Sequence, residues 1–82
     1  MAREVILQIM SLYRFLVSEE EAEKSIEQIL AKLHDEGYVC TATKVGESWV
    51  LIGDNFLFNL GYMQSICDKF SKKNWKWKVR ER

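Results

Sequence analysis

An α+β fold with two layers is predicted by three features of this 82-residue sequence. Residues 18–36 have the apolar spacing of an amphipathic helix, residues 38–52 contain two strand-like runs around a turn, and residues 74–80 alternate between apolar and basic side chains. Amphipathic helices and strands bury their apolar sides together, so this mixture predicts helices packed on a sheet. The length corresponds to one domain, residues 1–82.

The first predicted helix spans residues 18–36. Ser18 and Glu21 form a capping box, which satisfies two free backbone donors at the helix start. The apolar stripe expected to face the core consists of Ala22, Ile26, Ile29, Leu30 and Leu33. Gly37 follows at the position where a left-handed residue commonly ends a helix.

Two strands are predicted after this helix, Tyr38–Lys44 and Ser48–Ile52. A turn at Val45–Glu47 separates them, and both runs are rich in β-branched or aromatic residues. The pair is therefore expected to form a hairpin. The run Gly53–Asn55 ends the strand pattern and indicates a turn before the next element.

A second helix is predicted after this break, with Asp54 or Asn55 as its N-cap. Its apolar stripe would consist of Phe56, Leu60, Met63, Cys67 and Phe70. Gly61 lies inside this helix and would cost roughly 1 kcal/mol there. An alternative therefore remains, in which residues 56–60 form a third strand and the helix begins near Gly61.

The strand predicted at Asn74–Arg80 has two different sides. Its apolar side consists of Trp75, Trp77 and Val79, and its basic side of Lys76, Lys78 and Arg80. Successive side chains of a strand point to opposite faces. One side is therefore expected to close the core, while the other presents positive charge to a partner.

The N-terminal segment, residues 3–17, has two interpretations. As a strand, it places Val5, Leu7 and Ile9 on the face that the helices cover. As a helix, it has a polar stripe of Glu4, Gln8, Ser11, Arg14 and Ser18. The strand is favoured, because two helices joined only at Ser18 would have a shorter connection than the usual 2–8 residues. The N-terminal helix, which would give a winged-helix-like α+β fold, remains the alternative.

A strand at the N-terminus completes the order β-α-β-β-α-β. This is the arrangement of a two-layer ferredoxin-like βαββαβ sandwich. In that arrangement the first strand is central and the last strand lies at an edge of the sheet. The patterns identify no particular protein family.

A two-layer fold of this kind leaves one face of its sheet without helices. The residues of the first strand expected on that face are Ile6, Met10, Leu12 and Leu16. Exposed apolar patches usually mark an interface. We therefore expect a protein to cover this face, either a second copy in a homodimer or a different partner.

Positive charge is concentrated in the second half of the chain, although the net charge of the whole chain is zero. Residues 1–41 hold four Lys/Arg and eight Asp/Glu, a net −4, and residues 42–82 hold eight and four, a net +4. The candidate electrostatic contacts are Lys72, Lys73, Lys76, Lys78 and Arg80. Lysines on an edge strand also prevent edge-to-edge aggregation, which is the alternative explanation of them.

Nucleic-acid binding is the second function that the basic strand suggests. Lys and Arg neutralise phosphates, and Tyr13, Phe15 and Trp49 would stack on bases if they lay on the uncovered face. RNA-recognition modules share the order β-α-β-β-α-β. However, the residues around Trp49 lack the basic, glycine-flanked aromatic signature of those modules, and the zero net charge also argues against this function.

No catalytic, cofactor-binding or metal-binding residues are predicted. His34, the single histidine, falls in the last turn of the first helix, and no partner stands at metal-ligand spacing from it. Cys40 and Cys67 are expected to be buried thiols. The apolar run Val5–Met10 is too short to cross a membrane, so a cytoplasmic protein without membrane contact is expected.

These features together predict a small non-enzymatic protein-interaction or regulatory module that self-associates through its uncovered sheet face. Phage-type inhibitors and adaptors have this general character. A nucleic-acid-binding module that uses the basic C-terminal strand is the alternative. A small ferredoxin-like enzyme is the second alternative, which is disfavoured because no base stands beside a nucleophile in a recognisable motif.

Overall fold

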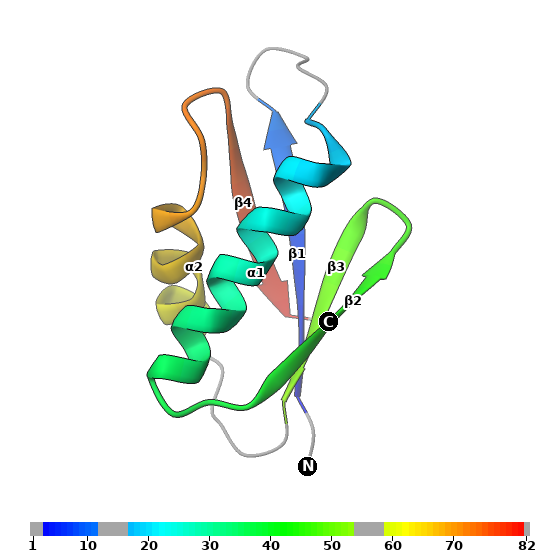
Figure 1. Ribbon diagram of the computed structural model, residues 1–82. Helices are drawn as coiled ribbons and strands as arrows, with labels where there is room; N and C mark the ends of the chain where they lie inside the picture. The colour runs from blue at the N-terminus through cyan, green and yellow to red at the C-terminus, as the bar shows by residue number, and fades with distance from the viewer. Residues whose placement is uncertain (1–2, 12–16, 54–58, 82) are drawn as a thin grey trace.

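The computed structural model describes residues 3–11, 17–53 and 59–81. These residues form a four-stranded antiparallel sheet with two helices on one side (Figure 1). The elements in chain order are β1 (Arg3–Ser11), α1 (Glu19–Asp35), β2 (Cys40–Val45), β3 (Ser48–Gly53), α2 (Leu60–Lys69) and β4 (Trp75–Glu81). The strand order in the sheet is β2-β3-β1-β4. The predicted α+β class is therefore confirmed.

The N-terminal segment forms β1, which lies inside the sheet. Leu7 stands opposite Trp49 of β3 on one side and opposite Val79 of β4 on the other. Val5 and Leu7 are only 1% and 0% exposed, because alternate residues of an extended chain point to the same face. The N-terminal helix and the winged-helix-like fold that it implied are therefore wrong. β1 ends at Ser11, and residues 12–16 lie outside the described part of the chain.

Helix α1 begins and ends within one residue of its predicted bounds. At its start, the Ser18 hydroxyl oxygen accepts a hydrogen bond of 3.1 Å from the Glu21 N–H. At its end, the Tyr38 N–H donates to the Leu33 carbonyl at 2.9 Å. The chain turns there through Gly37, whose φ of +91° is readily adopted only by glycine. Both predicted ends of the helix are confirmed.

The predicted hairpin is formed by β2 and β3. Val45 stands opposite Ser48, which leaves a two-residue turn at Gly46 and Glu47. The φ of Gly46 is +62°, and a glycine in the first turn position matches the twist of the flanking strands. β2 begins at Cys40, two residues later than the pattern suggested, and extends to Val45.

Helix α2 begins later than the main prediction placed it. The Asn59 side chain accepts a hydrogen bond of 3.1 Å from the Tyr62 N–H and acts as the N-cap. The predicted caps Asp54 and Asn55 are therefore wrong, and the alternative start near Gly61 is the better prediction. Gly61 stands in the first turn and not in the helix interior, where its cost would be larger. Residues 54–58, and Phe56 with them, lie outside the described residues.

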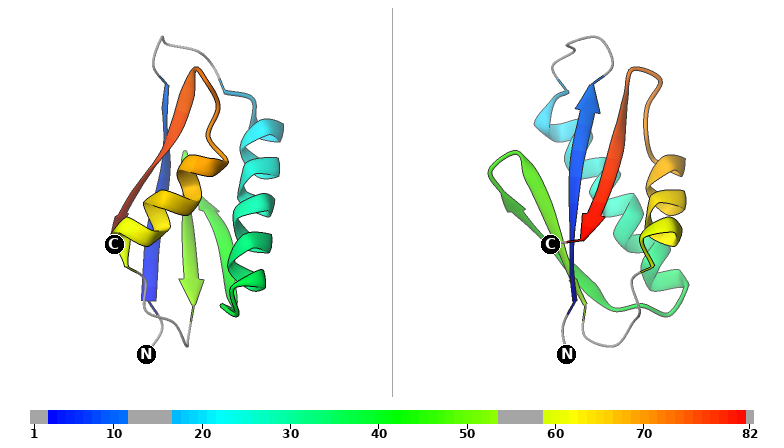
Figure 2. Two further views of the ribbon diagram at one scale, coloured as in Figure 1. Left: turned by 90° about the vertical axis from the view of Figure 1, so that its left-hand side faces the viewer. Right: turned by 180° about the vertical axis from the view of Figure 1, so that it is seen from behind.

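The hydrophobic core lies between the sheet and the helices. Trp75 and Trp77 are 1% and 0% exposed, as the alternation of the last strand predicted, and their rings meet edge to face with centroids 5.5 Å apart. Figure 2 shows α1 across one face of the sheet and α2 alongside β4. The clustered core residues are Val5, Leu7, Ala22, Ile26, Ile29, Leu33, Leu51, Met63, Ile66, Cys67, Trp75 and Trp77.

Candidate functional site

The first candidate surface is the face of the sheet that carries neither of the two described helices (Figure 2, right). Residues directly opposite each other in an antiparallel pair share a face, so the register shows which side chains lie there. We call this surface the open face. Its residues are Thr41, Thr43 and Val45 on β2, Ser48, Val50 and Ile52 on β3, Glu4, Ile6, Gln8 and Met10 on β1, and Lys76, Lys78 and Arg80 on β4.

The centre of the open face is apolar. Ile6 stands opposite Val50, and both Ile6 and Ile52 are half-buried although no helix covers them. Val50 is 4% exposed, shielded by its neighbours in the sheet, whereas Met10 and Val45 are 43% and 52% exposed. Strands of this composition gain stability when a second layer covers them.

The open face combines two sets of residues that sequence reasoning treated separately. Ile6 and Met10 lie on it, and the basic side of β4 lies on it too. Arg80 stands opposite Ile6, and Lys76 stands opposite Met10. An apolar centre is thus bordered by a row of positive charge on the same surface. The predicted contacts Leu12 and Leu16 lie outside the described residues.

Lys72 and Lys73 do not belong to the open face. They precede β4 in an exposed turn, where the Lys72 N–H donates to the Trp75 carbonyl at 3.0 Å. Their side chains add positive charge near the start of β4, beyond the row of Lys76, Lys78 and Arg80. The five predicted electrostatic contacts are therefore divided between two places.

Trp49 lies on the opposite side of the sheet from the one where base stacking was considered. It pairs with Leu7 and packs against the core on the helix side. Tyr13 and Phe15 lie outside the described residues. Among the strand residues that the structure describes, the open face carries no aromatic side chain. The expectation that Trp49 would stack on bases at the open face is therefore wrong.

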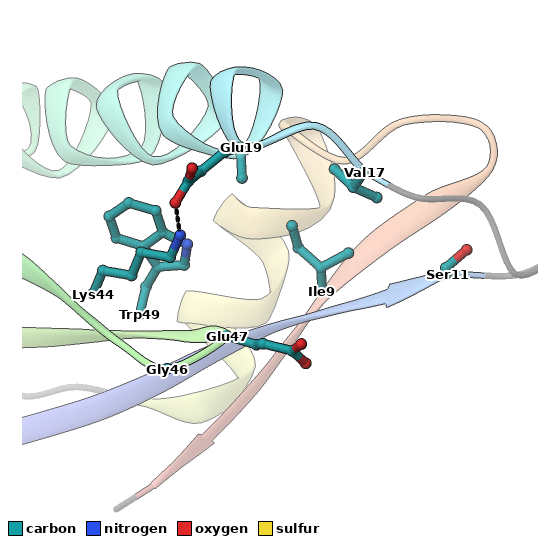
Figure 3. Close-up of a pocket in the computed structure, with 9 residues that line it drawn as sticks. Ile9, Ser11, Val17, Glu19, Lys44, Gly46, Glu47 and Trp49 are labelled. Atoms are coloured by element: carbon teal, nitrogen blue, oxygen red, sulfur yellow. Dashed lines mark hydrogen bonds and ion pairs between the residues drawn. The ribbon is translucent and has the colours of Figure 1, made fainter.

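A pocket lies on the helix side, between the start of α1, the end of β1 and the β2–β3 turn (Figure 3). Its volume is about 340 Å³. It is lined by Ile9, Ser11, Val17, Glu19, Ala22, Lys44, Gly46, Glu47 and Trp49. Lys44 forms an ion pair with Glu19, and its Nζ lies 5.8 Å from the centre of the Trp49 ring. Because its ammonium group is already paired, Lys44 ties the hairpin to α1.

The thiols and the histidine offer little reactive chemistry. Burial raises the pKa of Cys67 to about 12, with a smaller contribution from Asp68, and burial also raises the pKa of Cys40. Thiols of raised pKa carry little thiolate near neutral pH and are poor nucleophiles. His34 is exposed in the last turn of α1, where the sequence placed it. No group of three or more metal-ligating side chains occurs within the described ranges.

The described helices include none that is long and apolar enough to cross a membrane. In comparisons with known proteins, no protein family, no curated protein and no solved structure was found to match the chain.

Proposed function

We propose that this chain is a non-enzymatic protein-interaction module that forms a homodimer by stacking two open faces. The observation that carries the proposal is the uncovered apolar centre around Ile6, together with the exposed side chains of Met10 on β1 and Val45 on β2 of the same face. Uncovered patches of this kind mark interaction sites in small domains. A regulatory or adaptor role in the cytoplasm is the biological form that we propose, and the unpaired thiols of Cys40 and Cys67 suit such a reducing compartment.

The distribution of charge on the open face allows two copies to stack without bringing their basic residues together. A two-fold axis parallel to the strands, between two stacked sheets, would place β4 of one copy over β2 of the other. The open-face residues of β2 are Thr41, Thr43 and Val45, which carry no charge. The basic rows of the two copies would then avoid each other, and stacked sheets are a common packing mode.

We also propose that the fold is ferredoxin-like, which the element order and the strand order support.

Light scattering and sedimentation at micromolar concentrations test the homodimer. We expect the unmodified chain to be dimeric and Met10→Lys to be monomeric, because the new ammonium group would be buried in the interface without a partner. Gln28→Lys, on the exposed side of α1, adds the same charge away from the open face and should stay dimeric. Circular dichroism verifies that both variants are folded. A monomer at every concentration of the unmodified chain would refute the proposal.

Nucleic-acid binding is a second candidate, because Lys76, Lys78 and Arg80 form a row on one face. Three such contacts with single-stranded nucleic acid predict that log affinity falls with log salt with a slope of about −2. A fluorescence titration of single-stranded oligonucleotides between 50 and 200 mM salt, over which a slope of −2 lowers the affinity about 16-fold, measures this slope. Absence of binding at the lower salt concentration removes this candidate and leaves the homodimer proposal unaffected.

A further inference from the structure

The two edges of the sheet differ in how their backbone groups are satisfied. On the outer side of β4, the Gln64 side chain donates to the Trp77 carbonyl at 2.8 Å and accepts from the Val79 N–H at 3.1 Å. The Ser71 hydroxyl oxygen accepts from the Trp77 N–H at 3.1 Å. These side chains occupy the positions that a neighbouring strand would take. The β4 edge is therefore closed to strand addition between Trp77 and Val79.

In the part of the chain that the structure describes, the β2 edge has no such cover. The two-residue turn makes Val45 and Ser48 a hydrogen-bonded pair, so the alternate residues Cys40, Ala42 and Lys44 direct their N–H and C=O groups away from β3. Within the described residues, no group hydrogen bonds to the backbone of these three. An edge with unpaired backbone groups is a template for another strand.

A groove runs beside this edge on the helix side, between α1 and β2. Its volume is about 260 Å³, and it is lined by Glu23, Ile26, Glu27, Leu30, Ala42 and Trp49. The small side chain of Ala42 leaves room in the middle of the edge strand. Glu23 and Glu27 are exposed, and neither makes an ion pair within the described chain. The groove thus has an apolar floor and a negatively charged rim.

We propose that the β2 edge binds an extended segment of a partner protein as a fifth strand, with an Arg or Lys of that segment opposite Ala42. The aliphatic part of the basic side chain would cover Leu30, and its charged end would lie near Glu23 and Glu27. Added strands of this kind gain affinity from backbone hydrogen bonds and specificity from alternate side chains in pockets. The charge and shape of the groove select a basic residue with a long apolar stem.

A second copy of this chain fits the same edge poorly. Antiparallel pairing of β2 with its own copy around Ala42 would place alanine opposite alanine, so the groove would stay unfilled. It would also bring Glu23 and Glu27 of both α1 helices together without a neutralising charge, which is unfavourable. The site lies on a different surface from the open face and does not depend on the proposed homodimer.

The test uses a synthetic peptide as the probe, with blocked ends and alternating Thr and Val around one central Arg. Backbone NMR of the full chain should show shifts at the amides of Cys40, Ala42 and Lys44 as the peptide is added. The same peptide with Glu in place of Arg is the control and should bind more weakly. The Glu23→Gln, Glu27→Gln double variant should weaken Arg-peptide binding by about tenfold, because it removes both carboxylates that would attract the Arg side chain at the rim of the groove.

A matched control variant, Glu21→Gln with Asp35→Asn, removes two negative charges from the other side of α1 and should bind the Arg peptide as the unmodified chain does. Three outcomes would overturn the proposal. One is the absence of shifts at β2 at millimolar peptide. Another is equal binding of the Glu and Arg peptides. The third is unchanged Arg-peptide binding in the Glu23→Gln, Glu27→Gln variant.

Discussion

Ser25 is the one buried polar residue among the residues that the structure describes, and its hydroxyl joins three elements. Its oxygen accepts a hydrogen bond of 2.7 Å from the Trp77 indole N–H, and its proton is donated to the Phe70 carbonyl, also at 2.7 Å. One small side chain on α1 therefore satisfies a donor on β4 and an acceptor at the end of α2. Ser25 falls three residues after Ala22 and four before Ile29, so helical spacing places it beside the apolar stripe, but its polar side chain left it out of the predicted core.

Ser25→Ala should destabilise the fold by about 1–3 kcal/mol, because it leaves the Trp77 indole N–H and the Phe70 carbonyl buried without partners. Urea unfolding monitored by tryptophan fluorescence measures the change. Ser65→Ala, an exposed serine of α2, is the matched control and should change stability by less than ~0.5 kcal/mol. Equal effects of the two substitutions would show that the Ser25 hydrogen bonds contribute nothing.

Cys67 should make the fold less stable at alkaline pH. Its pKa is about 12 in the folded chain against an ordinary value of 9.0, so above pH 9 the unfolded chain loses the thiol proton while the folded chain keeps it. The contribution of the Cys67 thiol to the free energy of unfolding is complete below pH 9 and declines as the pH rises toward about 12. Urea midpoints of the unmodified chain should therefore fall more steeply between pH 8 and 10.5 than those of Cys67→Ala, a range chosen to span the onset of this titration. Parallel slopes would contradict the prediction.

The hydrogen bonds along the outer edge of β4 bear on why this strand carries lysines. Gln64 and Ser71 already occupy the outer hydrogen-bonding positions of this strand from Trp77 to Val79. Lysines are therefore not needed there to prevent edge-to-edge pairing. Because Lys76 and Lys78 project from the open face, their charge is available to whatever that face meets.

Gln64→Ala should open this edge. We expect a loss of stability of about 1–3 kcal/mol, mainly from the two broken hydrogen bonds to β4, and faster hydrogen exchange at the Val79 amide, which would lose its acceptor. Hydrogen exchange followed by NMR measures the second effect residue by residue. Gln28→Ala on the exposed side of α1 is the control, and Val79 exchange should be unchanged in it. Unchanged Val79 exchange in Gln64→Ala would mean that the edge is protected in another way.

For the molecule as a whole, the two sides of the sheet have opposite character. The outer surface of α1 is acidic, with an acidic first turn at Glu19, Glu20 and Glu21, whereas β4 supplies a basic row to the open face. The negative charge of α1 and the positive charge of β4 thus lie on opposite sides of the sheet. Partners of different charge would be directed to different surfaces.

Replacing Lys76, Lys78 and Arg80 together with Gln tests the role of the basic row. These side chains are exposed, so thermal stability should change little. The homodimer should form at least as tightly, because its contact is apolar and the row supplies only repulsion. Any oligonucleotide binding should disappear. Sedimentation and an oligonucleotide titration of the same sample provide the measurements, and a weakened dimer would show that the cations hold the interface together.

Much of the fold could be predicted because its signals are local. The Ser18 cap and Gly37 delimit α1, and the strict alternation of the last strand identified Trp75 and Trp77 as core residues. β3 gave no such signal, because Trp49, Val50, Leu51 and Ile52 are apolar on both faces of the strand. The side of the sheet on which Trp49 lies was therefore beyond prediction. The Asn59 cap was missed because the preceding Asp54 and Asn55 offered an equally good capping pattern.

Periodicity and capping depend on neighbours a few residues apart, and they alone were enough to identify the helices, the hairpin and the apolar side of each clearly amphipathic element. The pairing of Ile6 with Arg80, the closing of the β4 edge by Gln64 and the groove between α1 and Ala42 join residues far apart in the chain. Their positions follow from strand register and from the packing of the helices on the sheet. No local pattern encodes those relations, because they are settled only when the distant segments bury their apolar faces together.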